Sequence, residues 1–204
     1  MARWACKRYA TLKPHLFDAS MKIVVASDIH GISVELRSQL ACLGPHTVLS
    51  PWPGEGKPFA SEQEAVTAFH LQDGLTSYAR QIADVTQREP ALLIGFSVGA
   101  TSLWRHVSSP DCHPDSRAFL YYGSRIRDHL TLTPRCRTAV FFAESEPSFQ
   151  PEAVVNAVIN TGAQCEVIPG TRHGFMHPNS PHYRADLAQV HFQMILREAM
   201  NDHR

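Results

Sequence analysis

The segment Gly95-Phe96-Ser97-Val98-Gly99 has the G-x-S-x-G spacing of a serine nucleophile held on a sharp turn. A strand-like apolar run over residues 91–96 precedes the serine, and a stretch with helical spacing over residues 98–107 follows it. Glycines suit both flanking positions, because a side chain there would collide with neighbouring backbone in so tight a turn. The pattern predicts that Ser97 is a nucleophile and that the Val98 N–H, at a helix start, binds an oxyanion.

A serine hydroxyl needs a general base beside it, and histidine is the usual one. The chain has twelve histidines, of which His173 stands out because it follows the last strand-like run, residues 165–168. A base on that loop would lie at the same edge of a parallel sheet as Ser97. His173 is therefore the predicted base, and His177, four residues further on, is the alternative.

A carboxylate usually holds the tautomer of such a histidine and stabilises its cation. The strand-like run over residues 139–143 is followed by two acids, Glu144 and Glu146, which lie between nucleophile and base in the chain. We favour Glu146, because Glu144 is still close to the strand and Pro147 fixes the turn beside Glu146. Asp128, in the loop after the preceding strand, is a further alternative.

The first strand-like run ends in Ser27-Asp28-Ile29-His30-Gly31. In serine hydrolases with a strand–turn–helix nucleophile, the loop at this place supplies a second oxyanion N–H. Ile29 is the predicted donor and His30 the second choice, while Asp28 is placed to hold the loop by a hydrogen bond.

The spacing Asp28-x-His30 also resembles the opening metal motif of calcineurin-like phosphoesterases. That chemistry needs further ligands for two metal ions, and the other segments expected of such enzymes are missing from the chain. A metal site is therefore not predicted. A non-catalytic α/β binding domain that retains the serine turn is the other alternative, and a serine-directed probe distinguishes it from an enzyme.

Apolar side chains occur in the loops expected around Ser97. Trp52, Phe59, Phe175 and Met176 are predicted to form an apolar pocket for an acyl group. Arg125 and Arg172 lie in the same set of loops, but solvent-exposed charge is the simpler interpretation of both.

These residues require a framework of alternating strands and helices. Segments with helical spacing lie between the apolar runs. The runs are mostly apolar on both faces, whereas strands of a sheet with one solvent-exposed face would alternate apolar and polar residues. The order predicts an α/β fold with a mainly parallel sheet and right-handed crossovers. We expect an N-terminal extension over residues 1–20 and one domain over residues 21–204. The predicted strands are 23–26, 47–49, 91–96, 118–122, 139–143 and 165–168, and the predicted helices are 33–43, 61–88 with a break near Gly74, 98–107, 151–160 and 184–200.

Composition limits the possible partners. The 204 residues carry a formal net charge of zero, which gives no electrostatic reason to expect nucleic acid or anionic lipid as a partner. No apolar run is long enough to span a bilayer, and the N-terminus lacks the apolar core of a secretory signal. The five cysteines are scattered without a CxxC pair, which argues against a disulfide framework or structural zinc and favours a reducing, cytoplasmic setting. A small-molecule substrate and a monomer or homodimer are expected.

The ordered set of motifs resembles the dienelactone hydrolase family over about residues 21–200. The segments that carry the resemblance are Asp28-Ile29-His30-Gly31, Gly95–Gly99, Tyr121-Tyr122-Gly123, Glu144–Pro147 and Arg172–Phe175. The resemblance implies the α/β-hydrolase fold, a nucleophile–acid–base triad, no cofactor and small ester-like substrates.

Two residues depart from the family's pattern. The best-known members carry cysteine where this chain has Ser97, and aspartate is the usual acid where this chain has Glu146. The first departure shifts the expected activity from dienelactone hydrolysis to general ester or thioester cleavage through an acyl-enzyme intermediate.

Overall fold

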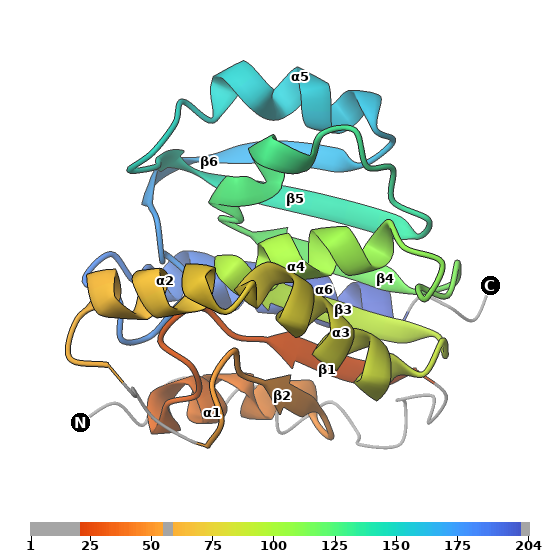
Figure 1. The fold of residues 1–204 in the computed structure, drawn as a ribbon, viewed down its shortest axis with the longest axis horizontal. Helices are drawn as coiled ribbons and strands as arrows, with labels where there is room; N and C mark the ends of the chain where they lie inside the picture. The colour runs from red at the N-terminus through yellow and green to blue at the C-terminus, as the bar shows by residue number, and fades with distance from the viewer. Residues whose placement is uncertain (1–20, 55–58, 201–204) are drawn as a thin grey trace.

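The computed structural model describes residues 21–54 and 59–200. Within them one sheet of six strands has the order β2-β1-β3-β4-β5-β6, and every neighbouring pair is parallel (Figure 1). The predicted extension over residues 1–20 lies outside the described residues. The strands are β1 (Lys22–Ala26), β2 (Thr47–Leu49), β3 (Ala91–Phe96), β4 (Arg117–Tyr121), β5 (Arg137–Ser145) and β6 (Gln164–Arg172).

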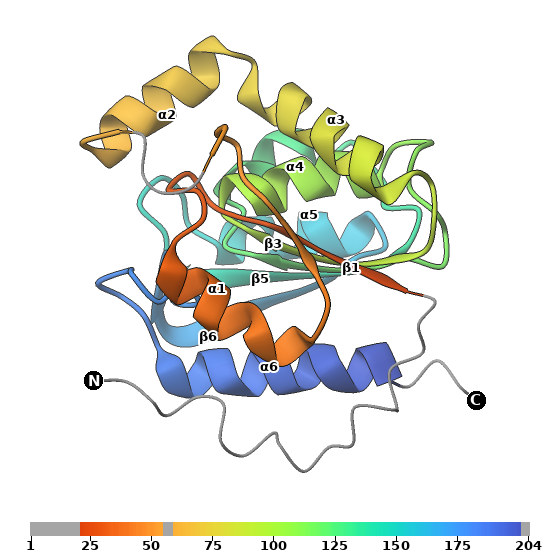
Figure 2. The ribbon, with the colours of Figure 1, turned by 90° about the horizontal axis from the view of Figure 1, so that it is seen from below.

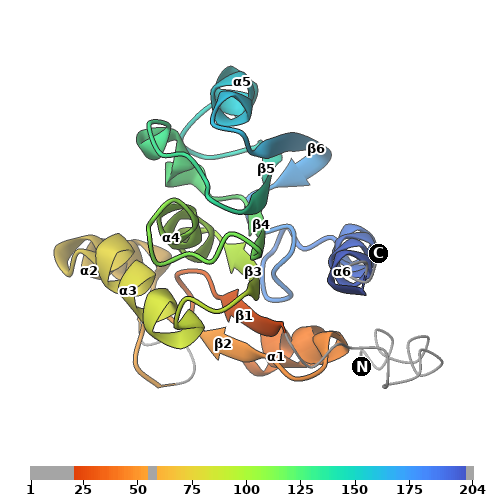
Figure 3. The ribbon, with the colours of Figure 1, turned by 90° about the vertical axis from the view of Figure 1, so that its right-hand side faces the viewer.

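Helices cover both faces of this sheet, as Figures 2 and 3 show. One face carries α1 (Val34–Leu40) and α6 (Ala185–Met200), and the other carries α2 (Glu62–Leu71), α3 (Gly74–Thr86), α4 (Val98–Val107) and α5 (Glu152–Asn160). Two 3₁₀ turns, η2 (Ala41–Leu43) and η3 (Ser124–His129), complete the order. The structure thus confirms the predicted α/β class.

The uniformly apolar strands are explained by a separate core on each face. All six residues of β3 are buried. Leu92 and Ile94 pack into the core beneath α1 and α6, whereas Leu93 between them packs into the core beneath α3 and α4. A period of two thus places alternate apolar side chains in two different cores.

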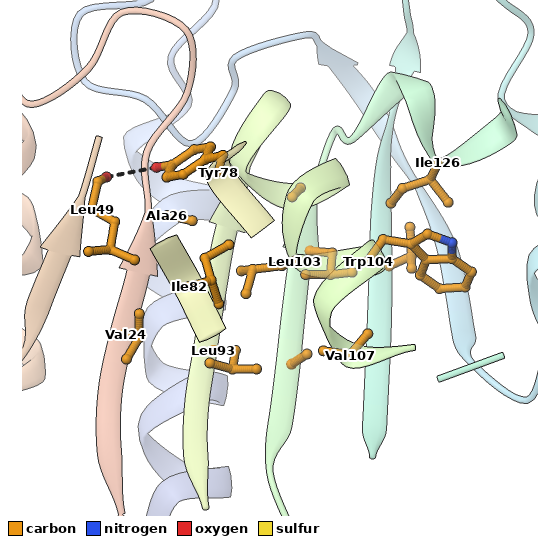
Figure 4. Close-up of a cluster of buried hydrophobic side chains, with 14 of the residues drawn as sticks. Val24, Ala26, Leu49, Tyr78, Ile82, Leu93, Leu103, Trp104, Val107 and Ile126 are labelled. Atoms are coloured by element: carbon orange, nitrogen blue, oxygen red, sulfur yellow. Dashed lines mark hydrogen bonds between the residues drawn. The ribbon is translucent and has the colours of Figure 1, made fainter. Parts of the chain in front are cut away.

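Figure 4 shows the core on the α3–α4 face. Leu103 and Trp104 of α4 and Ile82 of α3 are fully buried there. Tyr78 of α3 lies among them, and its hydroxyl donates to the Leu49 carbonyl at 2.8 Å. This bond anchors α3 to the end of the edge strand β2 and leaves the phenol satisfied in an apolar setting.

The start of α2 follows the predicted local signal. The Ser61 hydroxyl accepts from the Glu64 N–H at 3.2 Å, as a capping box requires. The predicted helix is interrupted before Gly74, where a Cβ would stand 2.4 Å from the Phe69 ring. The helix predicted over 33–43 is shorter than expected, because regular α-helix ends at Leu40 and continues as η2.

The strands near the predicted acid and base are longer than expected. β5 extends to Ser145 and β6 to Arg172, past Pro169. Proline is tolerated because β6 is an edge strand. The 3₁₀ turn η3 was not predicted. Among the described residues, none of the helices combines the length and apolar character needed to cross a membrane.

Gly99 fixes the approach of α4 to β1, because a Cβ there would lie 2.3 Å from the Ala26 carbonyl oxygen. We expect Gly99→Ala to lower the free energy of unfolding by about 3 kcal/mol or more, since backbone rather than a flexible side chain blocks the space. Urea denaturation followed by circular dichroism measures the change. Gly162→Ala is the control, because Gly162 has a positive φ of 93° but open space around it. We expect that substitution to cost only about 1–2 kcal/mol, and equal effects would contradict the steric explanation.

Candidate active site

The carboxyl ends of four parallel strands bring the predicted site residues to one edge of the sheet. Ser97 follows β3, Ile29 follows β1 and His173 follows β6 directly. Glu146 comes immediately after β5. This edge is where open α/β sheets bind their ligands.

The backbone at Ser97 is held in a rare conformation, with φ 51° and ψ −114°. The Ser97 N–H donates to the Tyr121 carbonyl at 3.0 Å, which ties the turn to β4. A Cβ at Gly95 would lie 2.7 Å from the Ala100 Cα, so the incoming strand and the outgoing helix can touch only with glycine there. Although Ser97 occupies the N-cap position of α4, its side chain makes no capping bond. The hydroxyl is therefore available to another partner.

That partner is His173. The Ser97 Oγ lies 3.0 Å from His173 Nε2, and His173 Nδ1 lies 2.6 Å from Glu146 Oε2. A carboxylate only accepts hydrogen bonds, so the imidazole proton belongs on Nδ1 and Nε2 is left to accept from the serine. The structure thus brings together the three side chains predicted to form a triad.

Two contacts fix the imidazole of His173 from the protein side. The backbone N–H of His173 donates to the Ser145 carbonyl at 3.2 Å, next to Glu146. The ring stands edge-on to Tyr122 with 4.9 Å between the ring centres. Tyr122 is fully buried and has a positive φ of 41°, a second strained residue beside the site.

The Glu146 side chain is wholly inaccessible to solvent. Its Oε2 also accepts from the Ser124 hydroxyl at 2.9 Å, and its Oε1 accepts from the Ala143 N–H at 3.4 Å. These donors offset part of the cost of burying a carboxylate. Ser124 is not among the residues predicted from the sequence, although it directly follows the Tyr121-Tyr122-Gly123 segment at the end of β4.

The other predicted acids and the alternative base have different partners. Glu144 accepts from the Gly170 N–H at 3.0 Å, and Asp128 accepts from Arg125 at 2.9 Å. His177 is buried with its Nε2 3.7 Å from Asp28 Oδ2.

Burial by itself would lower the pKa of His173, because it disfavours the imidazolium. The hydrogen bond that His173 donates to Glu146 and the negative charge of Glu146 act in the opposite direction, and the charges of Asp28 and Glu62 add to them. The net result raises the pKa of His173 above the usual value for histidine. The neutral form of His173, which accepts the proton from serine, therefore becomes the main form only at a higher pH than in an ordinary histidine.

The loop after β1 is held from both sides of Ile29. The Asp28 carboxylate accepts from the His30 N–H at 2.9 Å, and the Trp52 indole N–H donates to the Ile29 carbonyl at 2.7 Å. The His30 amide, the second choice as an oxyanion donor, is thus already in use. Ile29 and Ser97 line the same cavity.

This cavity has a volume of about 310 Å³, and most of its lining residues are polar. Besides Ser97 and His173, its polar lining residues are Asp28, His30, Glu62, His177, Asn179 and Ser180.

The apolar side chains predicted to form an acyl pocket do not line the cavity beside Ser97. Phe175 and Met176 are fully buried in the core beneath α1 and α6. Trp52 is 6% exposed and packs on Phe59 with 4.7 Å between ring centres, and neither residue lines the cavity beside Ser97. The loops do pass the site, but their apolar side chains turn inward, because burial against the sheet removes more apolar surface from water.

The metal-site alternative gains no geometric support from the described residues. Within them, no group of three or more histidine, cysteine, aspartate or glutamate side chains is arranged to hold a metal ion. Asp28 instead holds the His30 amide.

The pKa of His173 provides a test of this geometry. We expect titration of the imidazole by NMR to give a pKa above that of an unperturbed histidine, and Glu146→Gln to lower it, because the amide retains the shape but removes the charge. A His173→Gln spectrum identifies the resonance. Glu144→Gln is the matched control and should leave the value unchanged, since Glu144 bonds to Gly170. A pKa of His173 insensitive to Glu146→Gln would contradict the ion pair.

We compared the sequence and the structure with those of known proteins. No family model matches the chain. The uncharacterised protein YczH of Bacillus subtilis is 29% identical over 175 residues, covering 81% of this chain and 85% of YczH. A Klebsiella pneumoniae protein named as a candidate dienelactone hydrolase has a similar structure, with a TM-score of 0.66 at 15% identity over 90% of this chain and 89% of that one.

Two further solved structures agree. A dienelactone hydrolase-like promiscuous phosphotriesterase from metagenomic libraries gives a TM-score of 0.62 at 16% identity, over 88% of this chain and 85% of that one. The esterase PE8 gives a TM-score of 0.54 at 14% identity, over 89% of this chain and 93% of that one. The resemblance found in the motifs is thus confirmed at the level of the fold: this chain has the α/β-hydrolase fold that dienelactone hydrolase-like proteins share.

Proposed function

We propose that this protein is a serine hydrolase that cleaves small ester or thioester substrates through a Ser-His-Glu triad and an acyl-enzyme intermediate. The observation that carries the proposal is the unbroken chain from Ser97 Oγ through both nitrogens of His173 to Glu146, with distances of 3.0 and 2.6 Å. The structural likeness to esterases and dienelactone hydrolase-like proteins supports the same class of activity.

Acylation begins when His173 Nε2 takes the proton of the Ser97 hydroxyl while Oγ attacks the substrate carbonyl. Glu146 remains ionised and stabilises the imidazolium that forms. The negative charge on the carbonyl oxygen is stabilised by the N–H groups of Val98 and Ile29. Collapse of the tetrahedral intermediate breaks the bond to the alcohol or thiol, which leaves with the proton from His173.

Deacylation repeats these steps with water as the nucleophile. His173 removes a proton from water, and the resulting hydroxide attacks the ester carbonyl on Ser97. The second tetrahedral intermediate releases the acid, and the proton on Nε2 returns to Oγ. Atoms and charges balance without a cofactor or metal ion in either half.

The cysteines and the size of the cavity are consistent with the expected cellular compartment and substrate. The described cysteines Cys112, Cys136 and Cys165 are free thiols, which suits the reducing cytoplasm expected from the sequence. A cavity of about 310 Å³ suits a small acyl group.

Labelling with a fluorophosphonate probe tests the nucleophile. We expect wild-type protein to be labelled at Ser97, and Ser97→Ala to lose both labelling and at least about 10⁴-fold of kcat on short aryl esters and thioesters. Ser108→Ala is the control, because that hydroxyl donates to the Trp104 carbonyl at the far end of α4 and should retain activity. A folded wild-type protein that neither reacts with the probe nor turns over esters would favour a non-catalytic binding domain.

The anchor of the oxyanion loop provides a second test. Trp52→Phe removes the indole N–H that holds the Ile29 carbonyl, so we expect kcat to fall about tenfold, a loss of roughly 1.4 kcal/mol of transition-state stabilisation, with little change in KM. Trp104→Phe is the matched control, since its buried indole N–H donates to the His129 carbonyl, at the opposite end of η3 from Ser124. We expect similar losses of stability from both variants but a loss of kcat only from Trp52→Phe. Equal kcat values would show that Trp52 has no role in positioning.

A further inference from the structure

Two carboxylates face the cavity beside Ser97. Asp28 stands in the loop after β1, and Glu62 is the first residue of α2. The Asp28 side chain is only 7% exposed, whereas that of Glu62 is 67% exposed. Glu62 is therefore the carboxylate that a bound molecule is able to touch, and Asp28 acts on it through space.

The described lining of the cavity places no fixed cation beside these charges. Among the described residues that line it, none is a lysine or an arginine. Arg125 bonds to Asp128 and lies against His70, and neither Arg125 nor Arg172 lines the cavity.

The histidines of the cavity compensate the carboxylates only when protonated. His30 Nε2 lies 3.8 Å from Glu62 Oε2, and His177 Nε2 lies 3.7 Å from Asp28 Oδ2. His173 must be neutral to act as the base, so the form of the enzyme that reacts has one positive charge fewer at the site.

The charges of Asp28 and Glu62 are felt at the reacting atoms. Both line the same cavity as Ser97 and His173, and the negative charge of each acts to raise the pKa of His173. A field that favours an imidazolium there also favours any other cation in the same cavity.

We propose that the preferred substrates of this site are esters or thioesters that carry an ammonium group, and that substrates with a carboxylate are disfavoured. The inference rests on the proposed hydrolase function and specifies its substrate class. The cation is expected beside Glu62, where the carboxylate is accessible from the cavity.

Matched thioesters test the proposal. In one series the acyl chain ends in a trimethylammonio, a tert-butyl or a carboxylate group, and in a second series the same three groups end the thiol. The trimethylammonio and tert-butyl groups have nearly the same shape, so their comparison isolates charge. At pH 8, where ordinary histidines are neutral, we expect kcat/KM to follow the order cation, neutral, anion in at least one series, with about tenfold between successive members. The difference should shrink in 0.5 M salt.

Two variants on α2 locate the effect. Glu62→Gln should reduce the ratio of kcat/KM for the cationic and neutral members several-fold. Glu64→Gln is the control and should leave the ratio unchanged, because Glu64 caps the helix start and does not line the cavity. Glutamine also retains the capping pattern.

The outcomes separate the two proposals. If the tert-butyl thioester is hydrolysed in a Ser97-dependent way but the cationic member is no better in either series, the charge inference is overturned and the hydrolase stands. An unchanged ratio in Glu62→Gln would overturn the role of Glu62. If no thioester is hydrolysed and Ser97 is not labelled, the proposed hydrolase fails and the charge inference fails with it.

Discussion

The strained backbone at Ser97 is the constraint on which the rest of the site depends. A residue with φ 51° and ψ −114° is unfavourable by about 1–3 kcal/mol, and it persists only where the surroundings permit no alternative. Here β4 holds the Ser97 amide, and Gly99 lets α4 press against the end of β1. A relaxed turn would let the hydroxyl cap its own helix, as serines at helix starts commonly do, and would turn it away from His173.

The buried ion pair depends on the same sheet edge. Glu146 is shielded from water, yet donors from three elements surround it: Ser124 after β4, Ala143 within β5 and His173 after β6. A carboxylate in this position would be costly without them. The oxyanion loop is supported in a comparable way, since Asp28 holds it from within and Trp52 holds it from the loop after β2. Several residues outside the proposed triad thus set its geometry.

Sequence reasoning succeeded where local pattern and topology decide the outcome. The strand–turn–helix context of Ser97 and the place of His173 after the last strand depend on short segments and on parallel strand order, both of which can be read from apolar runs. It failed for side chains whose direction is set by distant packing. Phe175 and Met176 are in loops near the site, but nothing local indicates that they turn into the core beneath α6. Ser124 was missed for the same reason, because its partner Glu146 is 22 residues away and the 3₁₀ turn that presents it has no strong sequence signal.

The distribution of the site over the chain has a consequence for folding. Ser97 and its imidazole partner are 76 residues apart, and they meet only after β6 has joined the sheet at its edge, beyond β5. Such long-range parallel pairings form slowly, because loop closure must be completed before any contact compensates for it. During synthesis the nucleophile turn emerges well before the base does, so a nascent chain has no opportunity for premature chemistry. Reactivity at Ser97 therefore reports that the final strand is in register.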